Sequence, residues 1–233
     1  MMDIKLLSGG AANGLVSALT QHFTTLTGHG IAGEFSAVGA MRDRVRSGEP
    51  VDVLILTKSV IEALAEEGAV DADSITDVGN VVTGVAVRAG MPVVDVSTPE
   101  ALKAALAEAD SVYLPDPGRA TAGIHFARVL ERLGVAEALK DRLRPFPNGQ
   151  TAMAQMAAAA DRQPIGCTQV TEILNTPGVV YCGALPDPCG LVTTYTAAVA
   201  ARAADPEAAL SLVRLLTSPQ NAALRDRTGF SPA

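Results

Sequence analysis

The first half of the chain alternates short apolar runs with stretches whose apolar residues recur every three or four positions. The runs at residues 4–7, 31–35 and 51–56 predict strands, and the stretches from about residue 12 and through residues 41–45 predict helices. The 51–56 run is nearly continuous in apolar residues, which is typical of a parallel strand covered on both faces. This order is that of βαβ units, in which parallel strands alternate with helices.

The first predicted helix carries a single apolar stripe. Leu15, Leu19, Phe23 and Leu26 follow one another at three- and four-residue steps, so we expect them on the helix face that covers a sheet. Gly28 stands where a helix stop is expected.

The rest of the chain predicts a second α/β set and two strands that link the sets. The β-rich stretches at 78–87 and 191–199 are predicted to cross between two lobes, because no linker or internal repeat separates the sets. The predicted fold is therefore α/β with two lobes, residues 1–80 with 192–233 and residues 81–191. Each lobe would hold a central sheet flanked by helices, with a ligand cleft between the lobes. The other expected elements are helices at 61–65, 99–107, 121–133, 152–159, 206–216 and 219–227, and strands at 112–114, near 165 and at 179–181.

Composition favours a globular protein that does not bind nucleic acid. Hydrophobic residues make up 48% and charged residues 18% of the chain, enough apolar surface to offset chain entropy. The formal net charge is −7, and no cluster of Lys and Arg interrupts the acidic background, so nucleic acid is not an expected partner. A local site can still bind an anion, because helix N-termini and backbone amides act at short range.

The N-terminal pattern and the cysteines bear on location. No basic segment, apolar core and cleavage site precede the first strand, so we expect a cytoplasmic protein; an upstream leader would make it periplasmic. We expect no membrane insertion and a monomer or weak homo-oligomer.

Cys167, Cys182 and Cys189 lack metal-ligand spacing, and no metal site is predicted. Cys182 and Cys189 are close enough in sequence to close a small loop, but a reducing cytosol would keep them as thiols.

Three predicted strands end in small residues that are followed at once by a helix. These junctions are residues 7–11 (LSGGA), 35–40 (FSAVGA) and 116–123 (DPGRATAG). Each would expose helix-start N–H groups at the carboxyl end of a strand, where ligands of open α/β sheets bind. A tight turn needs small residues in any case, so it is the convergence of three such turns that indicates an anion site.

The order of these segments resembles the molybdate-binding family of type 2 periplasmic binding proteins over nearly the whole chain. The resemblance rests on the first and second junctions, the second leading to Gly48-Glu49-Pro50-Val51-Asp52, on the 116–123 turn followed by residues 130–134, and on Pro164-Ile165-Gly166. It implies a two-lobed fold that binds a small anion.

The same resemblance argues against molybdate itself. In that family, hydroxyls from the first two loops and a Tyr after the Ile-Gly strand help to hold the oxyanion, and those positions are Ala11, Val38 and Gln169 in this chain. Three charge-assisted hydrogen bonds would be lost, at about 1.5–3 kcal/mol each. A register shift of one residue would instead bring Ser8 or Ser36 into contact.

The C-terminal half resembles a different branch of this superfamily, which includes aconitate isomerase. The resemblance rests on residues 165–174 (IGCTQVTEIL), 177–179, 183–186 and 193–195. It implies an isomerase that moves the double bond of an unsaturated polycarboxylate by an allylic proton shift, without metal or organic cofactor. That reaction needs a carboxylate clamp, stabilisation of an enolate-like charge and a positioned acid or base.

The junction amides and hydroxyls are the candidate clamp, with Arg42 and Arg119 as loop cations suited to carboxylates. Arg42 also fits the wet face of a short helix, and Arg119 also fits a solvated loop charge. The candidate ligand-binding residues are Ser8, Gly9, Gly10, Ala11, Val38, Gly39, Arg42, Arg119, Thr121, Ala122, Thr168 and Gln169.

Three residues are candidate catalytic acids or bases. Histidine is the side-chain type best suited to acid–base chemistry near neutral pH, and His125 lies one turn into a predicted helix, so it points either to the cleft or into the packing. Glu172 lies early in a helix, where the dipole favours a carboxylate without any function. Tyr195 lies near the predicted crossing, where it either bonds the ligand or packs.

Two function classes follow. The first is an isomerase of the aconitate type, and the alternative is a non-catalytic binding protein for an organic anion or a molybdate-like oxyanion that serves a transporter or a sensor. A P-loop or Rossmann enzyme is poorly supported, because the chain has no Gly-x-x-x-x-Gly-Lys and no Gly-x-Gly-x-x-Gly after its first strand.

Overall fold

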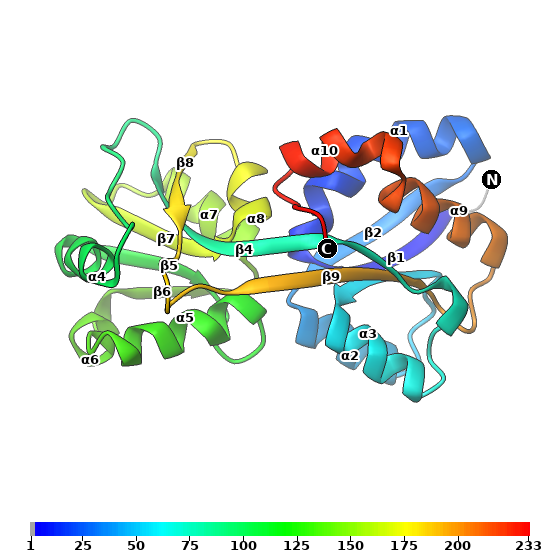
Figure 1. The fold of residues 1–233 in the computed structure, drawn as a ribbon, viewed down its shortest axis with the longest axis horizontal. Helices are drawn as coiled ribbons and strands as arrows, with labels where there is room; N and C mark the ends of the chain where they lie inside the picture. Colours follow the sequence, from blue (N-terminus) through cyan, green and yellow to red (C-terminus); the bar gives the residue numbers. More distant parts are fainter. Residues whose placement is uncertain (1–2) are drawn as a thin grey trace. The chain divides into compact units, whose positions relative to one another are not determined.

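The computed structural model describes residues 3–233, which form two compact units. Unit 1 comprises the described residues up to Val81 together with Thr193–Ala233, and unit 2 is Val82–Val192. The sequence analysis predicts the boundaries at 80/81 and 191/192. The strands β4 (Thr76–Arg88) and β9 (Val192–Val199) both pass from one unit into the other, so the chain crosses twice (Figure 1).

The sheet of unit 1 is built from parallel strands and one antiparallel neighbour. β1 (Asp3–Gly9) lies between β2 (Gly30–Ser36) and β3 (Val53–Thr57), parallel to both, and β9 pairs antiparallel with β3. All five residues of β3 are buried, as its continuous apolar run predicts for a strand covered on both faces. The helices of unit 1 are η1 (Gly10–Ala12), α1 (Asn13–Thr27), α2 (Val38–Arg46), α3 (Lys58–Glu66), η2 (Ala72–Ser74), α9 (Pro206–Thr217), η4 (Pro219–Asn221) and α10 (Ala222–Arg227).

The apolar stripe of α1 is shorter than the sequence predicts. Leu15, Leu19 and Phe23 are buried, but Leu26 is 63% exposed. The helix ends at Gly28, the predicted stop, and Leu26 lies in its last turn, beyond the part of the helix that the rest of unit 1 covers. The prediction that Leu26 packs in the core is therefore wrong.

Unit 2 contains a five-stranded sheet in the order β8-β4-β7-β5-β6. β4 pairs antiparallel with β7 (Pro164–Gln169) and β8 (Val179–Ala184), whereas β5 (Ser111–Pro115) is parallel to both β6 (Leu143–Phe146) and β7. The helices are α4 (Pro99–Glu108), α5 (Thr121–Arg132), α6 (Ala136–Leu139), η3 (Lys140–Arg142), α7 (Gly149–Ala158) and α8 (Val170–Leu174). The strand β6 is missing from the sequence prediction, because this short edge strand is only partly buried and contains Arg144 and Pro145.

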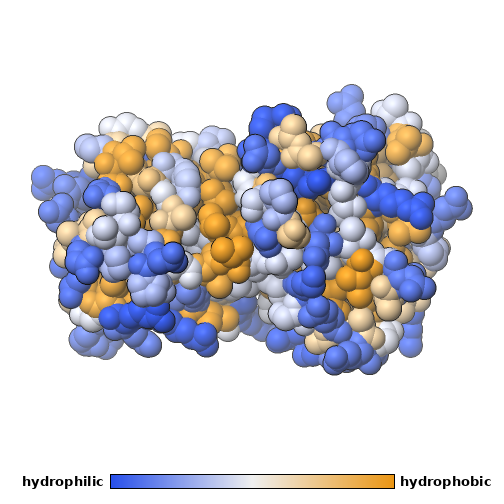
Figure 2. Space-filling model, in the orientation of Figure 1, coloured by the Kyte–Doolittle hydropathy of each residue, from blue (hydrophilic) through white to orange (hydrophobic). Residues whose placement is uncertain are grey.

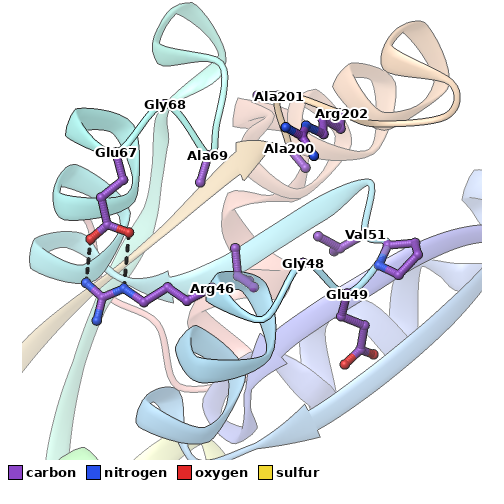
Figure 3. Close-up of a pocket in the computed structure, with 12 residues that line it drawn as sticks. Arg46, Gly48, Glu49, Val51, Glu67, Gly68, Ala69, Ala200, Ala201 and Arg202 are labelled. Atoms are coloured by element: carbon purple, nitrogen blue, oxygen red, sulfur yellow. Dashed lines mark hydrogen bonds and ion pairs between the residues drawn. The ribbon is translucent and has the colours of Figure 1, made fainter.

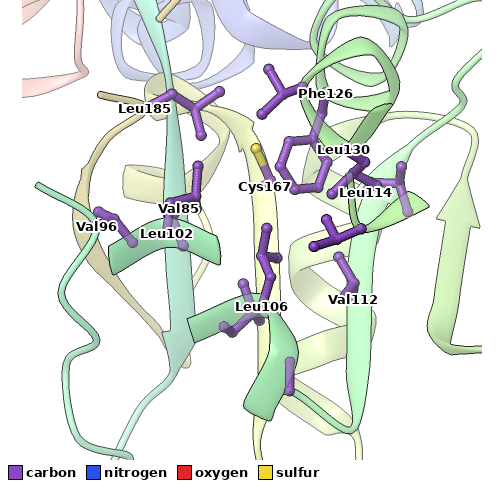
Figure 4. Packing of buried hydrophobic residues seen from close by; sticks show 14 of the residues in the cluster. Val85, Val96, Leu102, Leu106, Val112, Leu114, Phe126, Leu130, Cys167 and Leu185 are labelled. Carbon is purple, nitrogen blue, oxygen red and sulfur yellow. The ribbon is translucent and has the colours of Figure 1, made fainter. Parts of the chain in front are cut away.

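Two apolar clusters cover the two faces of this sheet. On one face, Leu102 and Leu106 of α4 and Phe126 of α5 pack against strand residues such as Val85 and Cys167 (Figure 4). On the other face, the core is formed by Tyr113 together with residues of α7 and α8, namely Ala152, Met153, Met156 and Ile173, and by Ala86. Unit 2 is therefore a helix–sheet–helix sandwich, which holds the strand ends and the helix starts in a rigid register.

The exposed surface is mixed in character. Hydrophobic residues appear on the visible face as separate patches between hydrophilic ones (Figure 2). The large hydrophobic side chains that are exposed are Leu26, Val93, Leu174, Val180 and Val192. Across residues 3–233, none of the helices combines the length and the apolar character that a bilayer span requires.

Candidate anion-binding site

The carboxyl ends of three parallel strands meet at one edge of the unit 1 sheet. Gly9 of β1 lies beside Ser36 of β2, and Ser8 lies beside Ile55 of β3. The next residues begin η1, α2 and α3, so three helix starts gather at this edge (Figure 1). The antiparallel strand β9 adds Tyr195, which pairs with Thr57, the last residue of β3.

The helices that start at this edge lack the usual N-terminal caps. Their N-cap residues Gly9, Ala37 and Thr57 make no side-chain capping hydrogen bond, and their first turns hold no acidic residue. Elsewhere in the chain, α4 and α9 are capped by Thr98 and Asp205 and carry a Glu in the first turn. Helix-start amides that no side chain caps present donors and a positive end of the helix dipole to a bound anion.

Gly9 allows the backbone to approach Tyr195 closely. A methyl group at Gly9 would lie 2.9 Å from Cε1 of Tyr195 and 3.1 Å from Cγ2 of Val38. Tyr195 is 2% exposed, and its ring packs edge-on against Phe230 with centroids 6.4 Å apart. The phenol ring is thus held beside the first strand–helix junction.

Several predicted ligand-binding residues of unit 1 offer no free side-chain donor. Ser8 is fully buried, and its hydroxyl donates to the carbonyl of Gly9 at 2.9 Å. Ala11 and Val38 are buried and lack hydroxyls. Gly10, Ala11 and Gly39 lie in the first turns of η1 and α2, where their contribution would come from the backbone.

Arg42 does not extend freely from the second junction. Its guanidinium donates to the carboxylate of Asp43 at 2.8 and 3.0 Å on the surface of α2. The contact is the one expected if Arg42 lies on the solvent-exposed face of α2. Arg42 could bind a ligand only if its guanidinium left Asp43.

Lys58 and Asp77, which the sequence analysis did not single out, form a charged pair at this edge. Lys58 is the first residue of α3, and its Nζ lies 2.8 Å from Oδ2 of Asp77. The buried hydroxyl of Thr196 donates to Oδ1 of the same carboxylate at 2.6 Å. These contacts lower the pKa of Asp77 in spite of its partial burial, and the pairing raises the pKa of Lys58. The edge therefore carries the Lys58–Asp77 ion pair beside its bare amides.

Unit 2 repeats the arrangement only in part at the carboxyl edge of β5, β6 and β7. The helices α5, α7 and α8 are the next elements after these strands, but α7 is capped by the side chain of Asn148 and α8 has Glu172 in its first turn. Ala120, the N-cap of α5, makes no side-chain capping bond, and the first turn with Thr121 and Ala122 holds no acidic residue. Just before it, the carboxylate of Asp116 accepts from the amide of Gly118 at 2.7 Å, and Arg119 follows in the same turn. The third predicted junction is thus another uncapped helix start.

Glu172 fastens α7 to the β7–α8 junction. Its carboxylate accepts from the hydroxyl of Thr168 at 2.5 Å and from the backbone amides of Gly149, Gln150 and Gln169. Glycine is required at 149, since a methyl group there would lie 1.9 Å from Oγ1 of Thr168 and 2.1 Å from Oε2 of Glu172. Four donors converge on one buried carboxyl group, so Glu172 and Thr168 are engaged with each other and with the protein backbone.

Burial raises the pKa of Glu172 above its ordinary value of 4.5, while the hydrogen bonds from Thr168 and from the three amides oppose that rise. The raised pKa is the kind of perturbation that functional carboxyl groups show, but structural buried carboxyl groups show it as well.

His125 contacts the loop at residues 186–190 rather than another titratable group. Its Nε2 lies 2.8 Å from the carbonyl oxygen of Cys189, so the proton must be on Nε2 for this hydrogen bond to form. Arg132, seven residues further along α5, donates to the carbonyl of Pro188. His125 and Arg132 thus hold the same loop, and a proton-transfer role for His125 stays a prediction.

Two buried hydroxyls near Gln169 were missed by the sequence analysis. Thr83 of β4 lies directly opposite Gln169 in the antiparallel β4–β7 pair, and Thr171 is the second residue of α8. Neither hydroxyl has a hydrogen-bond partner among the described residues. Residue type alone offered no signal for them, because threonine is common in strands and in first helical turns.

A surface hollow of unit 1 lies away from these strand ends. It encloses about 550 Å³ and is lined by the C-terminal ends of α2 and α3, the turns after them and residues 200–202 (Figure 3). Arg46 and Glu67 pair across it. Helix C-termini carry partial negative charge, so this hollow is unsuited to a small anion.

The described residues contain no group of three or more His, Cys, Asp or Glu side chains placed to hold a metal ion. Cys167, Cys182 and Cys189 are free thiols.

The profile of the family described as bacterial extracellular solute-binding protein matches residues 4–231. The aconitate isomerase of a Pseudomonas species is 27% identical over 237 residues, covering 98% of this chain and 87% of that protein.

Among solved structures, the periplasmic molybdate-binding protein of Azotobacter vinelandii superposes with a TM-score of 0.80 at 17% identity, over 99% of this chain and 100% of that one. The sulfate-binding protein SubI of Mycobacterium tuberculosis gives a TM-score of 0.75 at 19% identity, over 100% and 88% of the two chains. The predicted α/β fold and the predicted resemblance to periplasmic binding proteins are confirmed.

Proposed function

Because the chain belongs to the bacterial extracellular solute-binding protein family, we propose that it binds a small polycarboxylate anion and interconverts the cis and trans isomers of aconitate. The observation that carries the proposal is that η1, α2, α3 and α5, which start at strand carboxyl edges, have no side-chain cap and no acidic residue in the first turn, although α7, at the same edge of unit 2, is capped by Asn148. Bare amides gathered in this way suit carboxylate groups in a protein whose net charge is −7.

We propose a tricarboxylate because of the similarity to aconitate isomerase and because of the side chains at the strand carboxyl edges. The aconitate isomerase matches nearly the whole chain at 27% identity. Ala11 and Val38 lack hydroxyls, and the Ser8 hydroxyl is engaged, so the unit 1 edge offers amides and the Lys58 ammonium rather than hydroxyl donors. In unit 2, the amides of Thr121 and Ala122 and the side chain of Gln169 are the proposed contacts, together with Arg119.

The proposed reaction is an allylic proton shift. A C–H bond of the methylene group breaks, and the proton passes to a base. The electron pair forms a new C=C bond while the old one opens, and the intermediate carries its charge on a neighbouring carboxylate. A proton is then returned to the former vinyl carbon, so the sequence is balanced without a redox step or a cofactor.

For the proton transfer we place Tyr195 first. It lies against Gly9 at the amide-rich edge of unit 1. His125 and Glu172 stay in the proposal as the second and third candidates.

The test is proton NMR of cis- and trans-aconitate with the protein in deuterated buffer. Conversion of one isomer to the other, with deuterium entering the methylene position, is expected. Tyr195→Phe should lower kcat about 100-fold or more with little change in Kd, whereas Tyr181→Phe, a matched control in unit 2, should leave both unchanged. If the wild-type protein neither converts the substrate nor exchanges its proton, the isomerase proposal fails.

The second candidate function is ligand binding without catalysis, for an organic anion or a molybdate-like oxyanion. The structural roles of His125 and Glu172 favour it, because a binding protein needs no free acid or base. Thermal shift measurements with aconitate, sulfate and molybdate at equal concentration distinguish the ligands, since the ligand that binds the native state most tightly raises the midpoint most. The cytoplasmic location and the state of monomer or weak homo-oligomer stay predictions. Fractionation of cells carrying the native gene tests the first, and light scattering tests the second.

A further inference from the structure

Two hydroxyl groups at the β7–α8 junction of unit 2 are buried and lack a partner among the described residues. Thr83 is 1% exposed and Thr171 is 2% exposed. A buried hydroxyl without a hydrogen bond costs stability, because it has given up its hydration and received nothing in return. The great majority of buried polar side chains are satisfied, so an exception calls for a physical reason.

Both hydroxyls lie beside groups that already belong to the candidate site. Thr83 pairs with Gln169, and opposite residues of an antiparallel pair project from the same face of the sheet. Thr171 follows Gln169 by two residues and precedes Glu172. The backbone of Thr83 is fully engaged, since its amide donates to Leu191 and its carbonyl accepts from Leu185, each at 3.0 Å. Only the side-chain oxygen of Thr83 is left for a further partner.

Packing alone would favour valine at position 83. Valine has nearly the same shape as threonine, suits a strand, and carries no polar atom that must be satisfied. The neighbouring positions of β4 are indeed valines, at 81, 82, 85 and 87. The hydroxyl at 83 is therefore retained against stability, which is the pattern expected of a functional group.

We infer that the hydroxyls of Thr83 and Thr171 donate hydrogen bonds to oxygen atoms of the bound carboxylate, and that they help to select the ligand in unit 2. This inference rests on the proposed function, because it needs an anion at the carboxyl edge of β7. A hydroxyl donor aimed at a carboxylate forms a charge-assisted hydrogen bond, which is stronger than a neutral one.

Isosteric substitutions test the inference. Thr83→Val and Thr171→Val remove only the hydroxyls, and each should weaken the binding of trans-aconitate about 10-fold or more in calorimetric titration. Without ligand, each variant should unfold at the same temperature as the wild-type protein or at a higher one. The matched control is Thr176→Val, since the Thr176 hydroxyl is also buried but donates to the carbonyl of Glu172 at 2.7 Å. This control should lower the unfolding temperature and leave the Kd unchanged.

Two results would overturn the inference. If Thr83→Val and Thr171→Val destabilise the protein as Thr176→Val does and leave the Kd unchanged, the hydroxyls are structural. If they stabilise the protein and leave the Kd unchanged, the hydroxyls do not contact the ligand. A wild-type protein that binds sulfate or molybdate instead of aconitate refutes the polycarboxylate proposal alone, and the same variants titrated with that anion decide the inference. A wild-type protein that binds none of these anions overturns both.

Discussion

Replacing Gly149 with alanine should destabilise unit 2 through the carboxyl group of Glu172. The added methyl group would lie 2.1 Å from Oε2 of Glu172 and 1.9 Å from Oγ1 of Thr168, far inside contact distance. Glu172 and Thr168 are both buried, so neither side chain can move into solvent to make room. The carboxyl group must leave its donors, or the start of α7 must shift.

The expected loss of stability follows from the hydrogen bonds that Gly149→Ala would break. Glu172 accepts from the Thr168 hydroxyl and from three backbone amides. Hydrogen bonds to a charged group contribute about 1.5–3 kcal/mol each, so the loss of two would cost about 3–6 kcal/mol. Alanine is favoured over glycine in a helix by up to about 1 kcal/mol, which would offset only part of that cost. The steric effect should therefore determine the sign of the change.

Urea unfolding measures this cost as a change in midpoint at a constant slope. Gly118→Ala is the matched control, because Gly118 is exposed and its nearest atom, Oδ1 of Asp116, lies 3.3 Å away at the end of a side chain, so we expect a change within about 0.5 kcal/mol. In a Thr168→Ala/Glu172→Ala background, Gly149→Ala should cost at least about 2 kcal/mol less than in the wild type, since both obstacles are gone. A cost below about 1 kcal/mol in the wild type, or an equal cost in both backgrounds, would refute the reasoning.

Three further predictions concern single side chains. Burial raises the pKa of Glu172, so the native state binds the carboxyl proton more tightly than the unfolded state does. The resulting stabilisation is present below the ordinary pKa of 4.5, and it is lost as the pH rises through the raised pKa. Urea unfolding at a series of pH values should thus give Glu172→Gln a flatter pH dependence over that window, and an unchanged slope would contradict the assignment. Lys58→Met should raise the Kd for aconitate about threefold to tenfold, whereas Lys103→Met, at an exposed position of α4, should not. Equal effects of the two substitutions in calorimetry would remove Lys58 from the site. Asp52 is 4% exposed and accepts from the amides of Lys5 and Ala204 at 2.8 and 2.7 Å. Asp52→Asn keeps one acceptor, so it should lower the free energy of unfolding by about 2 kcal/mol in chemical denaturation. No loss would show that these hydrogen bonds contribute nothing.

The elements that could be predicted are those with a strong local pattern. The continuous apolar run of β3 and the small-residue junctions after β1, β2 and β5 were visible without any tertiary information. The short edge strand β6 was not visible, because its residues are partly exposed and include a proline. The burial of Leu26 was predicted wrongly, since helical spacing identifies a face but does not tell how far the neighbouring elements extend along it.

The candidate site also contains features that the local sequence predicts and features that it does not. Uncapped helix starts could be inferred from Gly and Ala at the junctions, because capping is a local property of a few consecutive residues. The partners of the charged and polar side chains could not be inferred. Asp77 meets Lys58, and the Nε2 of His125 meets the Cys189 carbonyl, through pairings between residues far apart in sequence.

By itself, the sequence determined the alternation of strands and helices, the positions of the bare helix starts, and a resemblance that indicates a small anion as the ligand. Those features depend on neighbours within a few residues, for which periodicity and backbone preference are sufficient. Only the tertiary structure decided that Thr83 faces Gln169, that Glu172 lies against Gly149, and that Lys58 is held by Asp77. Strand register and helix packing set these contacts, and both result from the burial of each unit's core as a whole.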